Sequence, residues 1–389
     1  MVLFWAISWA LLLKTAKNNL YSYELFHGRA TLPDRVFYDK IMNMTNRKQY
    51  SEATGKLADI NFDIVQDLPS GSHTAPKIVR LPGGELAVLK VPVQIVQRNN
   101  ETSDDFERRK SYILQDWARD IAKQNSISEV LTDFDGSLNI PRVIKYVPGQ
   151  QGYIIEQLAL GQDLSASGIK NMSSDARAKL AKELAFFLNY THQKTASQKP
   201  AQYSFYSRLD TKDKSASQKV CEFFTKYIPG QSDLLNDLFS DTLTWDNFTV
   251  MTHSDIRAAN ILYDADTNNF SLIDFGNSKY GNKYHDMVLF AAAANKELFP
   301  ILLQCAKIYN SLPKEKHQIY YDLNTIRKLF CRNIVFLAGY HAITNNYNDV
   351  QTKEMWAESV LPDLNYINKT YDDFMYMNDN KIFRGQHDK

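Results

Sequence analysis

Residues 251–287 read MTHSDIRAANILYDADTNNFSLIDFGNSKYGNKYHDM. Within this stretch, His253, Asp255 and Asn260 form the pattern H-x-D-x-x-x-x-N. Asp274 follows as the first residue of an Asp-Phe-Gly triplet. Each of these residue types is common in loops, but their order and spacing together favour a functional site over ordinary turn residues.

The residues between Asn260 and Asp274 predict a β-hairpin. Residues 261–262 are apolar, a polar turn covers residues 264–269, and a second apolar run covers residues 270–273. A hairpin brings the two ends of such a segment together. We therefore expect Asp274 to lie near Asn260.

These side chains fit phosphoryl transfer from a Mg²⁺-bound nucleoside triphosphate to a hydroxyl group. That reaction uses a carboxylate to accept or orient the hydroxyl proton, and oxygen ligands to hold Mg²⁺ beside the triphosphate. We expect Asp255 to be the catalytic base and Asn260 with Asp274 to bind Mg²⁺. His253 is expected to order the loop by hydrogen bonding and not to titrate in the reaction.

At these residues the chain resembles the kinase-like fold, and within it the aminoglycoside phosphotransferase and choline kinase superfamily. The resemblance covers residues 60–345. It implies a phosphotransferase with ATP or GTP as the donor and Mg²⁺ as the metal. It also implies a small-molecule hydroxyl acceptor, such as an aminoglycoside, a choline-like compound, a sugar or an amino alcohol.

The segment after Gly276 favours this superfamily over the protein kinases, which share both motifs. In protein kinases a long activation segment that ends in Ala-Pro-Glu follows the Asp-Phe-Gly triplet. Here Asp286 follows Gly276 within ten residues, and the chain contains no Ala-Pro-Glu. The resemblance implies that Asp286 opens the next helix and buttresses the catalytic loop.

Two alternatives stay open. Residues 257–260, Arg-Ala-Ala-Asn, look like the catalytic loop of tyrosine kinases, which keeps an atypical protein kinase possible. A kinase-fold binding module without catalysis is the other alternative, although all the polar catalytic positions are intact.

A lysine upstream is expected to bind the triphosphate. The resemblance implies a strand lysine that contacts the α- and β-phosphates, and Lys90 in Ala-Val-Leu-Lys-Val provides one. A helix acid should hold its ammonium group in place. Glu107 is the preferred partner, and Asp116 is the alternative.

Two further segments are expected to contact the nucleotide. Ser70, Gly71 and Ser72 lie where the resemblance implies a phosphate-covering loop, in which small residues let backbone N–H groups approach phosphate oxygens. Glu156, Gln157 and Leu158 resemble the hinge between lobes, where backbone groups pair with the purine edge.

The remaining sequence predicts an α+β architecture. Residues 60–92 read as strands with a Pro-Gly-Gly turn, and two more strands form a hairpin at 140–149 and 151–158. Helices are predicted at 104–124, at 173–193 with Ser174 as N-cap, and at 217–240, 285–298 and 324–343.

This pattern predicts a bilobal protein-kinase-like fold. Residues 1–59 would be a helical extension able to dock a protein partner. Residues 60–157 would form an N-lobe with an antiparallel β-sheet, and residues 158–389 a mainly helical C-lobe with the catalytic loop and the acceptor site.

Composition limits the possible partners and locations. The chain has 45 Lys and Arg against 44 Asp and Glu, which argues against nucleic acid as a partner. Three distant cysteines and scattered histidines predict neither disulfides nor a transition-metal site. The apolar run at residues 2–13 is too short to span a bilayer, so we expect a cytoplasmic protein, with a secreted or membrane-associated form as the alternative.

Overall fold

The structure is a computed structural model that describes residues 54–57, 60–68, 74–99, 101–164, 166–202, 216–239, 245–288, 296–344 and 350–385. They belong to two compact units. The first unit includes residues up to Asn125 and Arg142–Leu158, and the second includes Ser126–Pro141 and the chain from Ala159 onward. The apolar run at 2–13 and the predicted phosphate loop, Ser70 to Ser72, lie outside the described residues.

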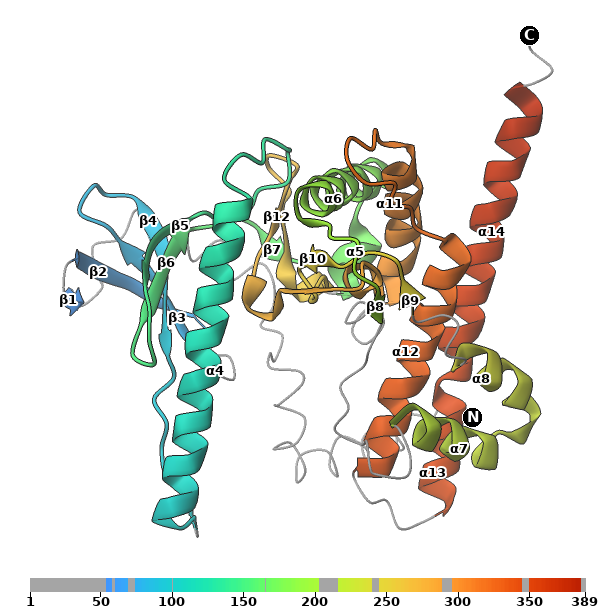
Figure 1. Ribbon diagram of the computed structural model, residues 1–389, viewed down its shortest axis with the longest axis horizontal. Helices are drawn as coiled ribbons and strands as arrows, with labels where there is room; N and C mark the ends of the chain where they lie inside the picture. Colours follow the sequence, from blue (N-terminus) through green and yellow to red (C-terminus); the bar gives the residue numbers. More distant parts are fainter. Residues whose placement is uncertain are drawn as a thin grey trace. The chain divides into compact units, whose positions relative to one another are not determined.

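The first unit is built on an antiparallel sheet with the order β1-β2-β3-β4-β6-β5 (Figure 1). Gly84, in the predicted turn between the third and fourth strands, has a φ of 84°. The sheet already begins within the range predicted as a helical extension, because its first strand precedes residue 60. The strands are β1 (Thr54–Leu57), β2 (Ile60–Asp67), β3 (Thr74–Arg80), β4 (Leu86–Pro92), β5 (Val143–Val147) and β6 (Tyr153–Gln157).

Helix α4 (Ser103–Val130) packs on this sheet. Trp117 and Ile121, which occupy one face of the helix at i and i+4, form a buried cluster with Ile154 of β6. The indole Nε1 of Trp117 also donates to the Gly152 carbonyl oxygen at 3.0 Å. The predicted helix at 104–124 is therefore confirmed and continues to Val130.

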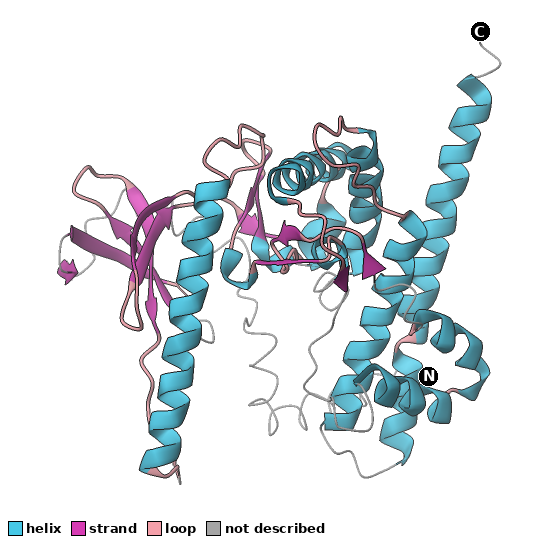
Figure 2. Ribbon diagram, in the orientation of Figure 1, coloured by secondary structure: helices cyan, strands magenta, loops and turns pink. Residues whose placement is uncertain are grey.

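The second unit is mainly helical, as Figure 2 shows. Its apolar side chains form one large buried cluster. Together the two units confirm the predicted α+β class. The helices are α5 (Ala166–Asn171), α6 (Ser174–Thr195), α7 (Ala216–Tyr227), α8 (Ser232–Leu238), α9 (Tyr284–Val288), α11 (Phe299–Ser311), α12 (Leu323–Thr344), α13 (Val350–Ser359) and α14 (Leu361–Gly385).

Short strands complete the second unit and carry the loops of the candidate site. They are β7 (Gln162–Asp163), β8 (Ala201–Gln202), β9 (Trp245–Asp246), β10 (Val250–Thr252), β11 (Ile261–Asp264), β12 (Asn269–Leu272) and β13 (Lys279–Gly281).

Helix α6 contributes to this core and packs against α11. Leu180, Leu184 and Leu188 are buried, as their i+4 spacing predicted. The N-cap prediction was wrong by one residue. Ser173 has an extended backbone and accepts the Ala176 N–H at 3.1 Å, whereas Ser174 is already helical.

One predicted helix is divided, and another is described only in part. The range 217–240 contains α7 and α8, which the turn Pro229–Gln231 separates. The range 285–298 begins as α9, but residues 289–295 lie outside the described residues. Among the helices that the structure describes, none combines the length and apolarity that a bilayer span requires.

Candidate functional site

Strands β11 and β12 form the predicted hairpin, with Ile261 opposite Leu272 in antiparallel register. At its open end, the Ile273 N–H donates to the Asn260 carbonyl oxygen at 2.9 Å. Asp274 is the residue directly after Ile273, so this hydrogen bond holds its backbone next to Asn260. The hairpin therefore brings the two predicted metal ligands together, as the sequence predicted.

A third strand fixes the hairpin within the second unit. Strand β7 pairs with β11, so that Gln162 lies opposite Tyr263. Gly161 precedes this strand with a φ of 117°. A Cβ atom at Gly161 would lie 2.7 Å from the Tyr263 carbonyl carbon, so only glycine fits this approach without strain.

Asp255 is buried in the loop before the hairpin, with 3% of its surface exposed. Its Oδ2 accepts the Asn277 Nδ2–H at 3.2 Å, and its Oδ1 forms an ion pair with the Arg257 Nε at 3.2 Å. Asn260 Nδ2 donates to the Asp255 backbone carbonyl oxygen at 2.9 Å. These contacts fix the position of the Asp255 carboxylate.

The pKa of Asp255 is raised to about 7, mainly by burial; the charge of Arg257 opposes this rise and the nearby Asp274 adds to it. Desolvation disfavours a charged carboxylate, which is the physical cause of the shift. A carboxylate with a pKa near neutrality is suited to accept a proton at physiological pH.

His253 orders the loop through both ring nitrogens. Its Nδ1 accepts the Asp255 N–H at 3.2 Å, so its Nε2 carries the proton and donates to the Ile273 carbonyl oxygen at 3.1 Å. Its ring lies 4.4 Å from that of Phe275 between centroids. Burial lowers the pKa of His253 to about 4, so the imidazole is neutral near pH 7.

Asp274 has an exposed side chain and a left-handed backbone with a φ of 67°. None of the described residues donates a hydrogen bond to its carboxylate. The Asn260 Nδ2 donates to the Asp255 carbonyl oxygen, and none of the described residues donates a hydrogen bond to its Oδ1. One carboxylate and one amide oxygen fit Mg²⁺, which prefers oxygen ligands and completes its shell with phosphate and water.

The described residues contain no larger cluster of metal-binding side chains. Within the described ranges no group of three or more His, Cys, Asp or Glu side chains could hold an ion. The pair Asn260 and Asp274 falls below that number and depends on phosphate oxygens for the remaining positions.

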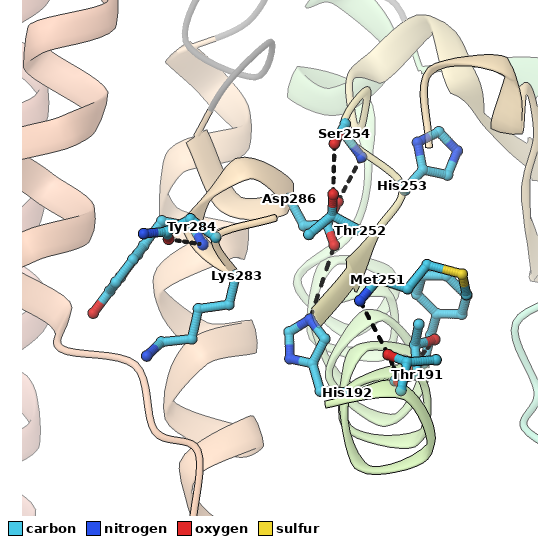
Figure 3. A network of polar contacts seen from close by, with 12 residues as sticks. Thr191, His192, Met251, Thr252, His253, Ser254, Lys283, Tyr284 and Asp286 are labelled. Carbon is cyan, nitrogen blue, oxygen red and sulfur yellow. Dashed lines mark hydrogen bonds and ion pairs between the residues drawn. The ribbon is translucent and has the colours of Figure 1, made fainter. Parts of the chain in front are cut away.

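Asp286 supports the loop from the first turn of α9 (Figure 3). Its Oδ1 accepts the Ser254 N–H at 2.7 Å, and Ser254 has a left-handed backbone with a φ of 61°. The hydroxyl oxygens of Thr252 and Ser254 lie 2.6 Å apart and share a hydrogen bond. This is the buttressing role that the resemblance implied. Burial raises the pKa of Asp286 to about 7.

In the first unit, Lys90 does not pair with the predicted helix acid. Its Nζ lies 2.7 Å from the Glu156 Oε2, in a contact between neighbouring strands β4 and β6. Gln124 of α4 hydrogen-bonds the other oxygen of Glu156. The prediction for Glu107 was wrong, because Glu107 is exposed and pairs with Lys110 at 3.4 Å. The alternative, Asp116, pairs with Arg119.

The other residues of the predicted hinge lie at the end of strand β6 and directly after it. Gln157 is exposed, and its backbone N–H donates to the Arg142 carbonyl oxygen at 2.9 Å. Its Oε1 accepts the Arg142 N–H at 3.3 Å. Leu158 is half-buried. Their role in nucleotide binding stays a prediction.

Sequence reasoning missed three contacts of the candidate site residues. Arg257 and Asn277 touch the Asp255 carboxylate, and the Glu156 side chain pairs with Lys90, where only the Glu156 backbone was expected to matter. The nearness of Arg257 to Asp255 in sequence was a usable signal. For Asn277 and Glu156, the contact depends on tertiary structure.

A model of the phosphotransferase enzyme family matches residues 96–304. Among curated proteins, no sequence matches this chain. Similar solved structures include a GDP complex of a mutant aminoglycoside 2′-phosphotransferase-IIIa, at 15% identity and a TM-score of 0.47, over 85% of this chain and 96% of that chain. A streptomycin and ATP complex of APH(2″)-IIa has 14% identity and a TM-score of 0.44, over 86% and 97%.

A third similar structure is the macrolide 2′-phosphotransferase MphH from Brachybacterium faecium, determined without ligand. It has 12% identity and a TM-score of 0.43, and the alignment covers 84% of this chain and 98% of that one.

Proposed function

The chain belongs to the phosphotransferase enzyme family, and from this premise we propose that it transfers the γ-phosphoryl group of a nucleoside triphosphate to a hydroxyl of a small molecule. One observation carries the proposal. The buried Asp255 lies in the same loop as Asn260, and the bond from Ile273 N–H to the Asn260 carbonyl brings Asp274 to that loop. The side chains that we propose as the base and the two metal ligands are therefore close together.

Asp255 would act as the catalytic base. Its pKa of about 7, raised by burial, supports this role because a base works best near its own pKa. Asn277 and Arg257 would orient the carboxylate toward the acceptor hydroxyl. His253 would keep the loop in place as a neutral side chain and would not exchange protons with the substrate.

Asn260 and Asp274 would hold Mg²⁺, which when bound would neutralise charge on the phosphate oxygens. Lys90 would contact the α- and β-phosphates, with Glu156 holding its ammonium group. The transfer needs no covalent intermediate on the protein. The hydroxyl oxygen forms a bond to phosphorus as the bond to the nucleoside diphosphate breaks, and the hydroxyl proton passes to Asp255.

A small molecule is favoured over a protein as the acceptor. The chain between Gly276 and Asp286 is short, and β13 and α9 account for most of it. Such a segment leaves little chain to dock a peptide. Aminoglycosides, choline-like compounds, sugars and amino alcohols are the acceptor classes to assay, with ATP and GTP as donors.

The first test is the substitution Asp255→Asn. We expect turnover to fall by about 10²–10⁴-fold, which is what a positioned general base contributes. The dissociation constant for nucleotide should stay unchanged, because the proposed role of Asp255 is toward the acceptor hydroxyl and not toward the nucleotide. Steady-state kinetics and titration calorimetry would measure both. The control is Asp266→Asn, an exposed position in the hairpin turn, which should leave both quantities unchanged.

The acceptor is found by measuring nucleotide consumption across a panel of those four classes, and separately with lysate proteins. Turnover with one small-molecule class would support the proposal. Transfer to lysate proteins alone would overturn it in favour of a protein kinase.

A further inference from the structure

A row of polar side chains lies behind the catalytic loop and has no part in the proposed chemistry (Figure 3). The Tyr309 hydroxyl of α11 lies 3.1 Å from the His192 Nδ1 of α6. The His192 Nε2 lies 4.0 Å from the Asp286 Oδ2 of α9, and the Asp286 Oδ1 accepts the Ser254 N–H. The row therefore connects two core helices to the residue before Asp255.

Two atoms in this row have unmet hydrogen-bonding capacity. His192 is 0% exposed and Asp286 is 1% exposed. Neither the His192 Nε2 nor the Asp286 Oδ2 has a hydrogen-bond partner among the described residues. A separation of 4.0 Å is a polar contact and is longer than a hydrogen bond. Because an unpaired buried polar group carries an uncompensated desolvation cost, the two atoms gain by facing each other.

One tautomer of His192 fits this pairing. Burial, with smaller contributions from the charges of Lys283 and Lys314, lowers the pKa of His192 to about 3, so the ring is neutral near pH 7. A neutral imidazole has one donor and one acceptor nitrogen. If the Tyr309 hydroxyl donates to Nδ1, then Nε2 carries the proton and points it at Asp286.

Ser254 explains why this support matters. A non-glycine residue with a φ of 61° is strained and is held there by its surroundings. The bond from its N–H to Asp286 is one of these restraints. Asp255 follows directly in the chain, so a relaxed Ser254 would move the Asp255 carboxylate.

We propose that His192 is a positioning residue for phosphoryl transfer, which orients the Asp286 carboxylate and through it the Ser254 backbone and Asp255. This inference rests on the proposed function. His192 does not touch the reactants and acts through Asp286. The competing explanation is that His192 only fills space in the core.

A matched pair of substitutions separates these explanations. Gln and Met have similar length and shape, but only Gln keeps an N–H group to direct at Asp286. We expect His192→Met to lower kcat about tenfold, the equivalent of about 1.4 kcal/mol, while KM for nucleotide stays unchanged. His192→Gln should retain kcat within about threefold of wild type. The control Leu180→Ala removes a buried side chain three turns earlier in α6, and should lower Tm without changing kcat.

Two further measurements complete the test. In an Asp286→Asn background, the Met and Gln variants should no longer differ, because a coupled pair is non-additive. Hydrogen exchange at the Ser254 amide, followed by mass spectrometry, should be about tenfold faster in His192→Met than in His192→Gln. All measurements are made at a temperature where every variant is folded.

The outcomes are distinct. Equal kcat for the Met and Gln variants, or equal exchange at Ser254, would overturn the positioning role and leave the proposed function intact. A wild-type protein without turnover on any acceptor would overturn the proposed function. The exchange measurement needs no turnover and would still decide whether His192 supports the loop.

Discussion

Asp274 combines an exposed carboxylate with a left-handed backbone, and these two properties decide how it can be tested. Asn tolerates a positive φ nearly as well as Asp, so Asp274→Asn should fold like wild type. It removes the only charged metal ligand that we propose. The substitution therefore separates metal binding from folding.

We predict that Asp274→Asn lowers the apparent affinity for Mg²⁺ by more than about tenfold, since losing even an outer-shell partner of a metal ligand costs about 10–100-fold. Turnover measured against Mg²⁺ concentration tests this, with Tm as the control for folding. A wild-type Mg²⁺ dependence would show that Asp274 is not a ligand.

Lys90 and Glu156 form an ion pair whose side chains are mostly buried, so each depends on the other. We predict that Lys90→Met destabilises the protein by about 3–5 kcal/mol, because it leaves the Glu156 carboxylate buried without its counter-charge. Adding Glu156→Gln should recover most of that stability. KM for nucleotide should be raised in both variants, because both lack the ammonium group.

Urea unfolding and steady-state kinetics measure these two effects separately. A double variant with the wild-type KM for nucleotide would mean that Lys90 holds the sheet together and has no contact with the phosphates.

At the scale of elements, the pairing of β7 with β11 depends on a single glycine. We predict that Gly161→Ala destabilises the protein by more than about 1–3 kcal/mol, because it adds a Cβ to a residue with positive φ and presses it on the Tyr263 backbone. Urea unfolding measures the loss.

The matched control is Gly230→Ala in the same unit. Gly230 does not have a positive φ, and a Cβ there would meet nothing within 4 Å. The free energy of unfolding of the Gly230→Ala variant should change little or increase by about 0.4–1 kcal/mol. Equal effects at the two positions would mean that the close approach of β7 to the hairpin does not contribute to stability.

For the whole molecule, nucleotide binding and stability are linked. We predict that Mg²⁺ with ATP or GTP at about 100 times Kd stabilises the protein by about 2.7 kcal/mol and raises Tm, because a ligand that binds only the folded state shifts the unfolding equilibrium. Removing Mg²⁺ with EDTA should reduce the rise. Differential scanning calorimetry measures it, and an unchanged Tm together with no turnover would favour a silent binding module.

The motif residues were predictable because their contacts are local. His253, Asp255, Asn260 and Asp274 belong to one loop and one hairpin, and alternating apolar residues with a polar turn are enough to predict such a unit. The same holds for α4 and α6, whose apolar faces repeat at helical spacing. For these elements, the spacing of apolar residues over a short range is enough to predict the secondary structure.

The partners of the site residues came only from tertiary structure. Lys90 and Glu156 meet because β4 and β6 are neighbours in the sheet, although α4 and β5 separate them in sequence. His192 meets Asp286 because α6 packs beside the loop that α9 supports. Both contacts join elements that are far apart in the sequence, and the local periodicity and turn patterns that predict each element do not specify which distant element it packs against.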